Sequence, residues 1–265
     1  MKDYIDVNRK TWDQKVGVHV ESEFYNVKGF LSGVNSLRKI ELPLVQSIAA
    51  KDILHSQCHF GLDTLSLARM GLNVTGVDFS DEAIIKAKAL AEQTDLPVNF
   101  VCDDVMKLIK IPNNAFDLVF TTYGVLGWLH DLKIWAQNIY SKLRSGGTLL
   151  LVEFHPYVWS LDDEFKVPHY DYFKSEAIIE NVEFTYADVD KAKALNTQTV
   201  TWNHSISEVY QALKNAGFQI ADFNEYDFSP YPCFPNVMER ADQEFVFEHL
   251  KSQIPMAYHI QAVKP

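Results

Sequence analysis

The chain has 265 residues, of which 47% are hydrophobic and 22% are charged, values typical of one large globular domain, with or without an inserted segment, and not of a disordered chain. Its 35 acidic residues outnumber 24 basic ones, and the formal net charge of −11 disfavours nucleic acid and anionic membranes as partners. Three widely spaced cysteines, no apolar signal segment and no membrane-spanning run predict a cytoplasmic protein without a disulfide framework.

The N-terminal part of the chain differs in pattern from the middle of the chain. The first forty residues have a helical pattern, so residues 1–45 are expected to form an N-terminal helical entry or lid segment. Residues 51–55 then predict a short buried strand, followed by a turn through Gly61 and a helix. Residues 72–78 predict a second strand, and Ser80 is a good N-cap for the next helix.

The alternation of strands and helices continues beyond this second strand. Residues 97–102 and 116–121 predict a third and a fourth strand. A helix over about 132–143 is expected to be stopped by the glycine pair at 146–147, before a fifth strand over 148–152. Continuous apolar strands separated by helices indicate a doubly wound α/β fold with a mostly parallel sheet.

The alternation lapses in the aromatic, acidic stretch from 156 to 204. Its composition is unlike that of a flexible linker, so we expect an inserted lid that faces the substrate and contains a small antiparallel hairpin. A capping box at 205–208 begins a helix that ends at Gly217. Strands near 218–223 and 257–263 would bring the sheet to seven strands.

A ligand site is expected where the first turn meets the end of the second strand. In doubly wound sheets, ligands bind beyond the carboxyl ends of the strands at the point where strand order reverses. The turn from His55 to Gly61 and the acid Asp78 should meet there. The Asp78 carboxylate is well placed to accept both hydroxyls of a ribose, and Phe79 to lie against an adenine face.

Five segments in this order resemble the motif set of class I S-adenosylmethionine-dependent methyltransferases, most closely a bacterial subgroup whose first motif reads LHLQCHFG-DTLSLAR. The segments are 53–61, GVDFS at 76–80, CDDV at 102–105, FDLV at 116–119 and LRSGGT at 143–148. The resemblance implies a Rossmann-like methyltransferase fold, with a cofactor-binding half over 46–155 and completion of the sheet by 205–265. It also implies S-adenosylmethionine as cofactor and S-adenosylhomocysteine as product.

The resemblance assigns roles around the adenosine. Asp78 would hold the ribose and Phe79 would stack on adenine. Asp104 would accept a hydrogen bond from the adenine amino group, a role for which Asp103 competes. The Val105 amide would bind a ring nitrogen.

The resemblance also assigns roles around the methionine end. The Thr121 carbonyl would meet the amino group, and Trp12 or Tyr25 would close over the carboxylate. The first motif departs from the usual D-x-G-x-G-x-G, because only Gly61 remains of its acid and three glycines. His55 and the Gln57 amide would replace the contacts of the missing acid.

Cys58, close to His55 and His59, allows other interpretations. The three are metal-ligand types, but no second ligand pair stands out, so we predict no metal. A thiol at a helix N-terminus can act as a nucleophile. A small buried residue in a tight turn beside the cofactor is the alternative that we favour.

Candidates for work on the methyl acceptor follow the fourth and fifth strands. Tyr123, Trp128 and His130 follow the fourth strand, and Glu153 and His155 follow the fifth. Methyl transfer needs in-line alignment and exclusion of water more than a strong base. Where the acceptor must lose a proton, Tyr123, Glu153 or His155 is the predicted catalytic group.

The function predicted from the sequence is therefore S-adenosylmethionine-dependent methyl transfer to a small-molecule acceptor. The protein would be a monomer or homodimer with no nucleic-acid or membrane partner. The alternative is a non-catalytic nucleoside-binding or regulatory protein that retains the fold. A nicotinamide dehydrogenase would need G-x-G-x-x-G in the first turn, and Gln57 and His59 argue against it.

Overall fold

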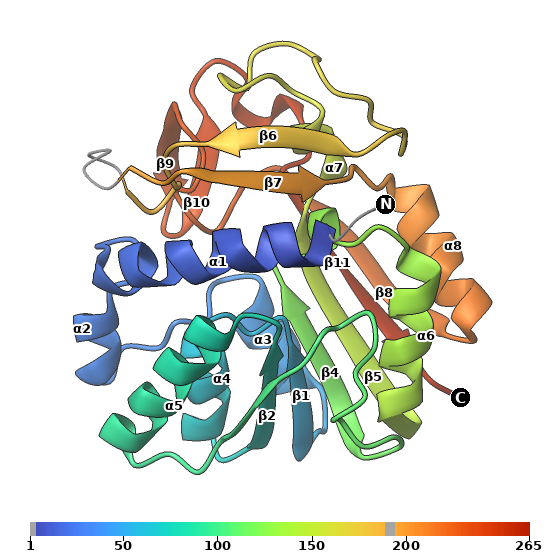
Figure 1. Ribbon diagram of the computed structural model, residues 1–265. Helices are drawn as coiled ribbons and strands as arrows, with labels where there is room; N and C mark the ends of the chain where they lie inside the picture. The colour runs from blue at the N-terminus through green and yellow to red at the C-terminus, as the bar shows by residue number, and fades with distance from the viewer. Residues whose placement is uncertain (1–3, 189–193) are drawn as a thin grey trace.

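A computed structural model describes residues 4–188 and 194–265, and a seven-stranded sheet forms its centre (Figure 1). In spatial order the strands are β3 (Asn99–Cys102), β2 (Asn73–Asp78), β1 (Asp52–Ser56), β4 (Phe116–Thr122), β5 (Leu143–Phe154), β11 (Ala257–Val263) and β8 (Gln219–Tyr226). All neighbouring pairs are parallel except those of β11, which runs antiparallel to β5 and to β8. The predicted doubly wound, mostly parallel sheet is confirmed, and its strand order reverses between β1 and β4.

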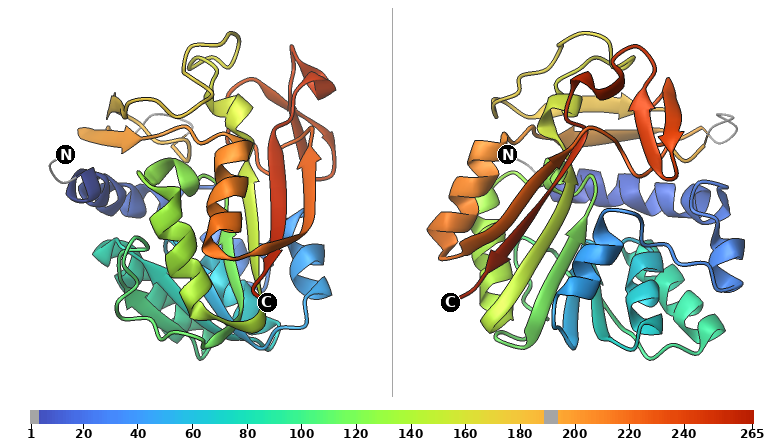
Figure 2. Two further views of the ribbon diagram at one scale, coloured as in Figure 1. Left: turned by 90° about the vertical axis from the view of Figure 1, so that its right-hand side faces the viewer. Right: turned by 180° about the vertical axis from the view of Figure 1, so that it is seen from behind.

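Helices pack on both faces of this sheet, as the views in Figure 2 show. On one face lie α3 (Glu41–Ser47) and α4 (Leu62–Arg69), with α5 (Asp81–Thr94) beside α4. On the other face lie α6 (Leu132–Lys142) and α8 (Ile206–Ala216). Successive strand residues point to opposite faces, so Ile53 and Leu54 enter different apolar cores. No helix among the described residues is long and apolar enough to cross a membrane.

Side-chain caps begin the helices as the sequence predicts. The Ser80 hydroxyl accepts a hydrogen bond from the Ala83 amide at 3.1 Å and begins α5. Ser205 caps α8 through the Glu208 amide at 3.3 Å, and Gly217 ends that helix with φ 107°. These local signals fix the points at which the chain turns back toward the sheet.

The glycine pair at 146–147 does not stop α6, contrary to the prediction. The helix ends at Lys142, and Leu143 already has extended backbone and pairs with Phe116. The Leu143 side chain is fully buried in the core under α6. Gly146, with φ 79°, then lies inside the longer strand β5, where the register with β4 shifts.

The N-terminal helices α1 (Tyr4–Glu21) and α2 (Val27–Leu31) lie outside the alternating pattern, and α1 crosses the molecule between the sheet and a hairpin (Figure 1). The hairpin consists of the antiparallel strands β6 (Ile178–Val182) and β7 (Thr197–Thr201), preceded by α7 (Pro156–Trp159). The Asn8 amide donates to Val200 O at 2.8 Å and accepts from Val200 N at 2.9 Å. Helix α1 is therefore fixed to the predicted lid, of which residues 189–193 lie outside the described part.

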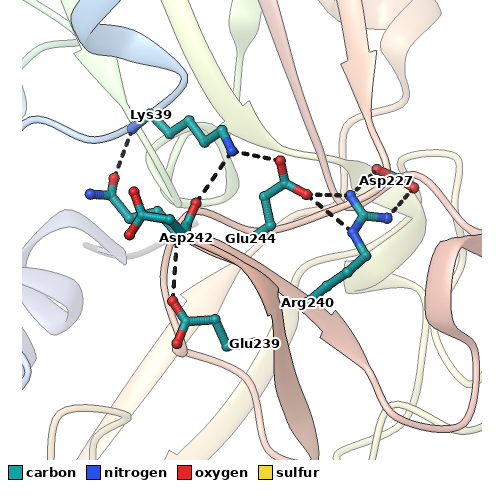
Figure 3. Close-up of polar contacts among 7 residues, drawn as sticks. Lys39, Asp227, Glu239, Arg240, Asp242 and Glu244 are labelled. Carbon is teal, nitrogen blue, oxygen red and sulfur yellow. Dashed lines mark hydrogen bonds and ion pairs between the residues drawn. The ribbon is translucent and has the colours of Figure 1, made fainter.

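A second hairpin, β9 (Val237–Ala241) and β10 (Glu244–Phe247), precedes the 3-10 helix η2 (Lys251–Gln253) and was not predicted. Strand β9 is mostly exposed and polar, so it gives no alternating apolar signal. Figure 3 shows polar contacts that join this hairpin to other segments, through Arg240 of β9 and Glu244 of β10. Lys39 Nζ contacts Glu244 Oε1 at 2.7 Å, and both Arg240 Nη atoms contact Asp227, at 2.7 and 3.0 Å.

Candidate cofactor and active site

A cleft lies beyond the carboxyl ends of β1, β2 and β3, next to the point of strand reversal. Its empty volume, including the space open to solvent, is about 410 Å³. Residues from α1, from the loops after those three strands and from the loop after β4 line it: Tyr4, Ile5, Asn8, Gln57, Val77, Asp78, Phe79, Asp103, Asp104, Val105, Met106, Trp128 and Leu129. Helix α1 therefore forms part of the wall, through Tyr4, Ile5 and Asn8.

Asp78 ends β2 and faces this cleft. Its Oδ2 accepts a hydrogen bond from the His59 amide at 2.8 Å, and its Oδ1 accepts from the Ser80 amide at 3.0 Å. Burial raises the pKa of Asp78 to about 6, although these amide bonds act in the opposite direction. Phe79 lines the same cleft, and its carbonyl accepts from Arg9 Nε at 3.2 Å. The carboxylate keeps lone pairs for further donors.

The two acids after β3 differ in how their oxygens are used. The oxygens of Asp103 accept from the amides of Asp104 and Lys110, at 2.9 and 2.7 Å, and so shape the loop. Asp104 accepts from the Met106 amide through Oδ1. Its buried Oδ2 accepts no hydrogen bond and is 3.4 Å from Nζ of the exposed Lys107. Of the pair, Asp104 has the oxygen left for a ligand.

The first loop, residues 57–61 after β1, has at two positions a backbone conformation that glycine usually adopts, although neither residue is glycine. Gln57 and His59 have φ values of 57° and 50°, in the left-handed region that side chains disfavour. Gln57 Nε2 donates to Val125 O at 3.1 Å, whereas its buried Oε1 accepts no hydrogen bond. Gly61, with φ 83°, precedes α4, where Phe100 leaves no room for a Cβ. The loop therefore offers the cleft an unused acceptor.

His55 and Cys58 are not among the residues that line the cleft. His55 Nδ1 is 2.8 Å from Thr64 Oγ1 in α4, and burial lowers the pKa of His55 to about 3. Burial raises the pKa of the Cys58 thiol well above its usual range, which disfavours a thiolate nucleophile. Among the described residues, no three His, Cys, Asp or Glu side chains form a group that can hold a metal ion.

Trp12 and Tyr25 belong to an aromatic cluster over the first loop. The Trp12 ring lies 5.1 Å from His59 and 5.2 Å from Trp128, centre to centre. The Tyr25 hydroxyl is 2.6 Å from that of Tyr186 in the lid segment. Thr121 is fully buried at the end of β4, and its hydroxyl donates to Ser56 O at 3.2 Å.

Two of the acid/base candidates have structural partners. The Glu153 carboxylate accepts hydrogen bonds from the backbone amides of residues 124, 125, 126 and 154, and so holds the loop after β4. His155 Nδ1 accepts from the Tyr157 amide, and its Nε2 lies 2.9 Å from Glu225 Oε1. Both side chains are buried.

Tyr123, the third acid/base candidate, directly follows β4 and contacts a buried carboxylate. Its hydroxyl donates to Oε2 of the fully buried Glu41 at 2.7 Å. Its ring contacts that of Tyr231, with centres 5.2 Å apart. Burial raises the pKa of Glu41 to about 7 and that of Tyr123 well above its usual range. No sequence pattern singles out Glu41, because it follows no strand.

The sheet order and the acid-lined cleft at the strand reversal define the Rossmann-like fold of class I methyltransferases. Residues 54–151 match the family model described as a methyltransferase domain, which covers less than half of the chain. A ubiquinone biosynthesis O-methyltransferase of Coxiella burnetii is 29% identical over 130 residues, covering 48% of this chain and 55% of that one. The S-adenosyl-L-methionine-dependent Diels-Alderase iccD of Talaromyces variabilis is 32% identical over 124 residues, covering 44% and 42%. The chain thus spans about half the length of these curated relatives.

Solved structures show the same fold over most of the chain. An S-adenosylmethionine-dependent methyltransferase from Mesorhizobium loti aligns with a TM-score of 0.59 and 19% identity, over 88% of this chain and 99% of that one. Another from Clostridium acetobutylicum aligns with a TM-score of 0.57 and 16% identity, over 98% of both chains. At these identities the likeness establishes the fold.

Proposed function

We propose that the protein is an S-adenosylmethionine-dependent methyltransferase that acts on a small-molecule acceptor. The observation that carries this is the pair of acids, Asp78 and Asp104, which follow neighbouring strands and face one cleft. Asp104 Oδ2 and Gln57 Oε1 are buried and accept no hydrogen bond. They fit a ligand that has one donor group on its adenine and a second donor group at its opposite end. The methyltransferase-domain match over residues 54–151 supports the same function.

The adenosine half of the ligand would be held by four residues. The Asp78 carboxylate would accept from the ribose hydroxyls, and Phe79 would lie against adenine. Asp104 Oδ2 would accept from the adenine amino group, and the Val105 amide would donate to a ring nitrogen. Asp103 keeps the loop in shape for these contacts.

When bound, the cofactor would supply a methyl group on a sulfonium, and the neutral thioether of S-adenosylhomocysteine would be the leaving group. The protein's part is to align an acceptor with that methyl and to exclude water. Glu153 and His155 would contribute by holding backbone, given their hydrogen bonds. Tyr123, predicted from the sequence as a catalytic group, would orient the acceptor, since its hydroxyl donates to Glu41.

The acceptor would be neutral or cationic, because the chain carries a formal net charge of −11. We propose that the segment 156–204 walls the acceptor side and that residues 46–155 bind the cofactor. Nucleic acid is not expected as a substrate. A cytoplasmic location and a monomeric or homodimeric state complete the proposal.

The test is transfer of a labelled methyl group from S-adenosylmethionine into a pool of small metabolites, with Asp78→Ala as the control enzyme. We expect labelled product and S-adenosylhomocysteine with the wild type and strongly reduced amounts with the variant. Cofactor binding without any methyl transfer would contradict the proposed activity. It would fit either the non-catalytic alternative or a cofactor-dependent reaction without methyl transfer, such as the one named for the similar Diels-Alderase of Talaromyces variabilis.

A further inference from the structure

Lys15 in α1 is a buried cation without a counter-ion. The residue is 6% exposed, and no hydrogen bond or ion pair from the described residues reaches its Nζ. The ammonium instead lies over two indole rings, 5.0 Å from the centre of Trp12 and 5.4 Å from that of Trp128. Buried cations in proteins are normally paired with an acid, because leaving water is costly.

The titratable groups around Lys15 do not supply that negative charge. His19, on the same helix, and His59, in the first loop, share a hydrogen bond of 2.8 Å. Burial and the neighbouring Lys15 lower the pKa of His59 to about 3, and the pKa of His19 falls well below its usual range. Both are therefore neutral at physiological pH. Burial alone lowers the pKa of Lys15 to about 8.

The position of Lys15 along α1 relates it to the cleft. Asn8 lines the cleft, and Lys15 lies on the same buried face of the helix. Seven residues separate them, which is about 10 Å along a helix. Trp128 lines the cleft and Trp12 contacts His59, so Nζ lies beside the first loop. Gln57, with its unused Oε1, belongs to the same loop.

We propose that Lys15 Nζ pairs with the α-carboxylate of the cofactor's methionine end, while Gln57 Oε1 accepts a hydrogen bond from its α-ammonium. This inference rests on the proposed function and adds a residue that no sequence motif singled out. The site would then select ligands with a complete amino-acid tail, because only they neutralise the buried ammonium. Lys15 would be a binding residue and not a proton carrier.

The test measures binding by calorimetry for three ligands that differ in their tails. S-Adenosylhomocysteine has the carboxylate and the amine, its decarboxylated analogue has only the amine, and 5′-methylthioadenosine has neither. We expect Lys15→Met to weaken S-adenosylhomocysteine binding by about 10- to 100-fold, the scale of a charged hydrogen bond, and to change the other two by less than about threefold. Lys10→Met, on the exposed face of the same helix, is the matched control and should change none of them.

A structural role for Lys15 would give a different pattern. Without ligand, Lys15→Met should unfold at a temperature equal to or above that of the wild type, because it removes an unpaired buried charge. Added S-adenosylhomocysteine should also raise the unfolding temperature of this variant by less than that of the wild type. Equal losses for all three ligands, unchanged binding of S-adenosylhomocysteine, or a less stable unliganded variant would overturn the role of Lys15. If the wild type binds none of the ligands, the proposed function fails as well.

Discussion

The backbone amide of His59 donates a hydrogen bond of 2.8 Å to Oδ2 of Asp78, and so joins the loop after β1 to the end of β2. His59 has φ 50° and Gln57 has φ 57°, conformations that cost side-chain-bearing residues about 1 kcal/mol or more each. The carboxylate thus holds a strained loop in addition to facing the cleft. A first motif without its usual glycines can keep its shape in this way.

Replacement of Asp78 by alanine should weaken S-adenosylhomocysteine binding by about 1.5–3 kcal/mol, the scale of a charged hydrogen bond. The loss combines the ribose contacts and the support of His59. Calorimetry on the wild type and the variant at equal pH and salt measures it. Unchanged affinity would remove Asp78 from the site.

The pH dependence of binding should follow Asp78, whose pKa is raised to about 6. Ribose hydroxyls favour the ionised carboxylate, so affinity should fall as the pH drops below about 6, by up to about tenfold per pH unit. The free energy of unfolding without ligand changes with pH in the opposite direction. The stabilising contribution of protonated Asp78 is fully present below the ordinary pKa of an aspartate, and it is lost as the pH rises through about 6. A flat affinity profile from pH 7 to 5, with Asp78→Asn as comparison, would contradict this.

Asp104 should accept a hydrogen bond from the amino group of adenine and so distinguish adenine from other bases. S-Inosylhomocysteine, which carries a carbonyl at that position, should bind the wild type at least about tenfold more weakly than S-adenosylhomocysteine, because the acceptor Oδ2 would face another acceptor. Asp104→Asn should reduce this preference, since an amide can donate. Equal binding of the two ligands by the wild type would show that Asp104 does not face the base.

Replacing both Gln57 and His59 by glycine tests whether the loop's side chains serve the ligand. Glycine relieves the left-handed backbone but removes the Gln57 bond to Val125 and adds unfolded-state entropy. We expect weaker binding of S-adenosylhomocysteine, by about 1 kcal/mol for each lost contact. Tighter binding by the double variant would show that the side chains of Gln57 and His59 weaken cofactor binding. That result would favour the non-catalytic alternative.

The contact between α1 and the lid should matter for stability and for binding, because Asn8 both makes this contact and lines the cleft. Asn8→Ala removes both hydrogen bonds to Val200 in β7 and should lower the free energy of unfolding by about 1–3 kcal/mol. Because α1 forms part of the cleft wall, S-adenosylhomocysteine binding should weaken too. Denaturant unfolding and calorimetry measure the two effects, with Lys10→Ala as the control. Deleting about residues 157–200 would break the same contact, so it tests the lid less cleanly.

Local signals in the sequence were sufficient for the sheet and one end of the site. Ser80, Ser205 and Gly217 mark helix ends through contacts with near neighbours, and the acid that ends the second predicted strand lies in the cleft. Contacts between distant residues were not predictable in this way. Lys15 meets Trp128 only after the chain has folded, and the hairpin of β9 and β10 makes its ion pairs with residues distant in the sequence or in other segments.

Binding of S-adenosylmethionine in the cleft between Asp78 and Asp104 is the central claim. The most direct measurement is a calorimetric titration of S-adenosylhomocysteine into the wild-type protein and into the Asp78→Ala, Asp104→Ala double variant, with NAD as a comparison ligand. We predict one site per chain with about micromolar affinity in the wild type, loss of at least about tenfold in the variant, and no binding of NAD. No binding to the wild type, or equal binding to a folded double variant, would contradict it.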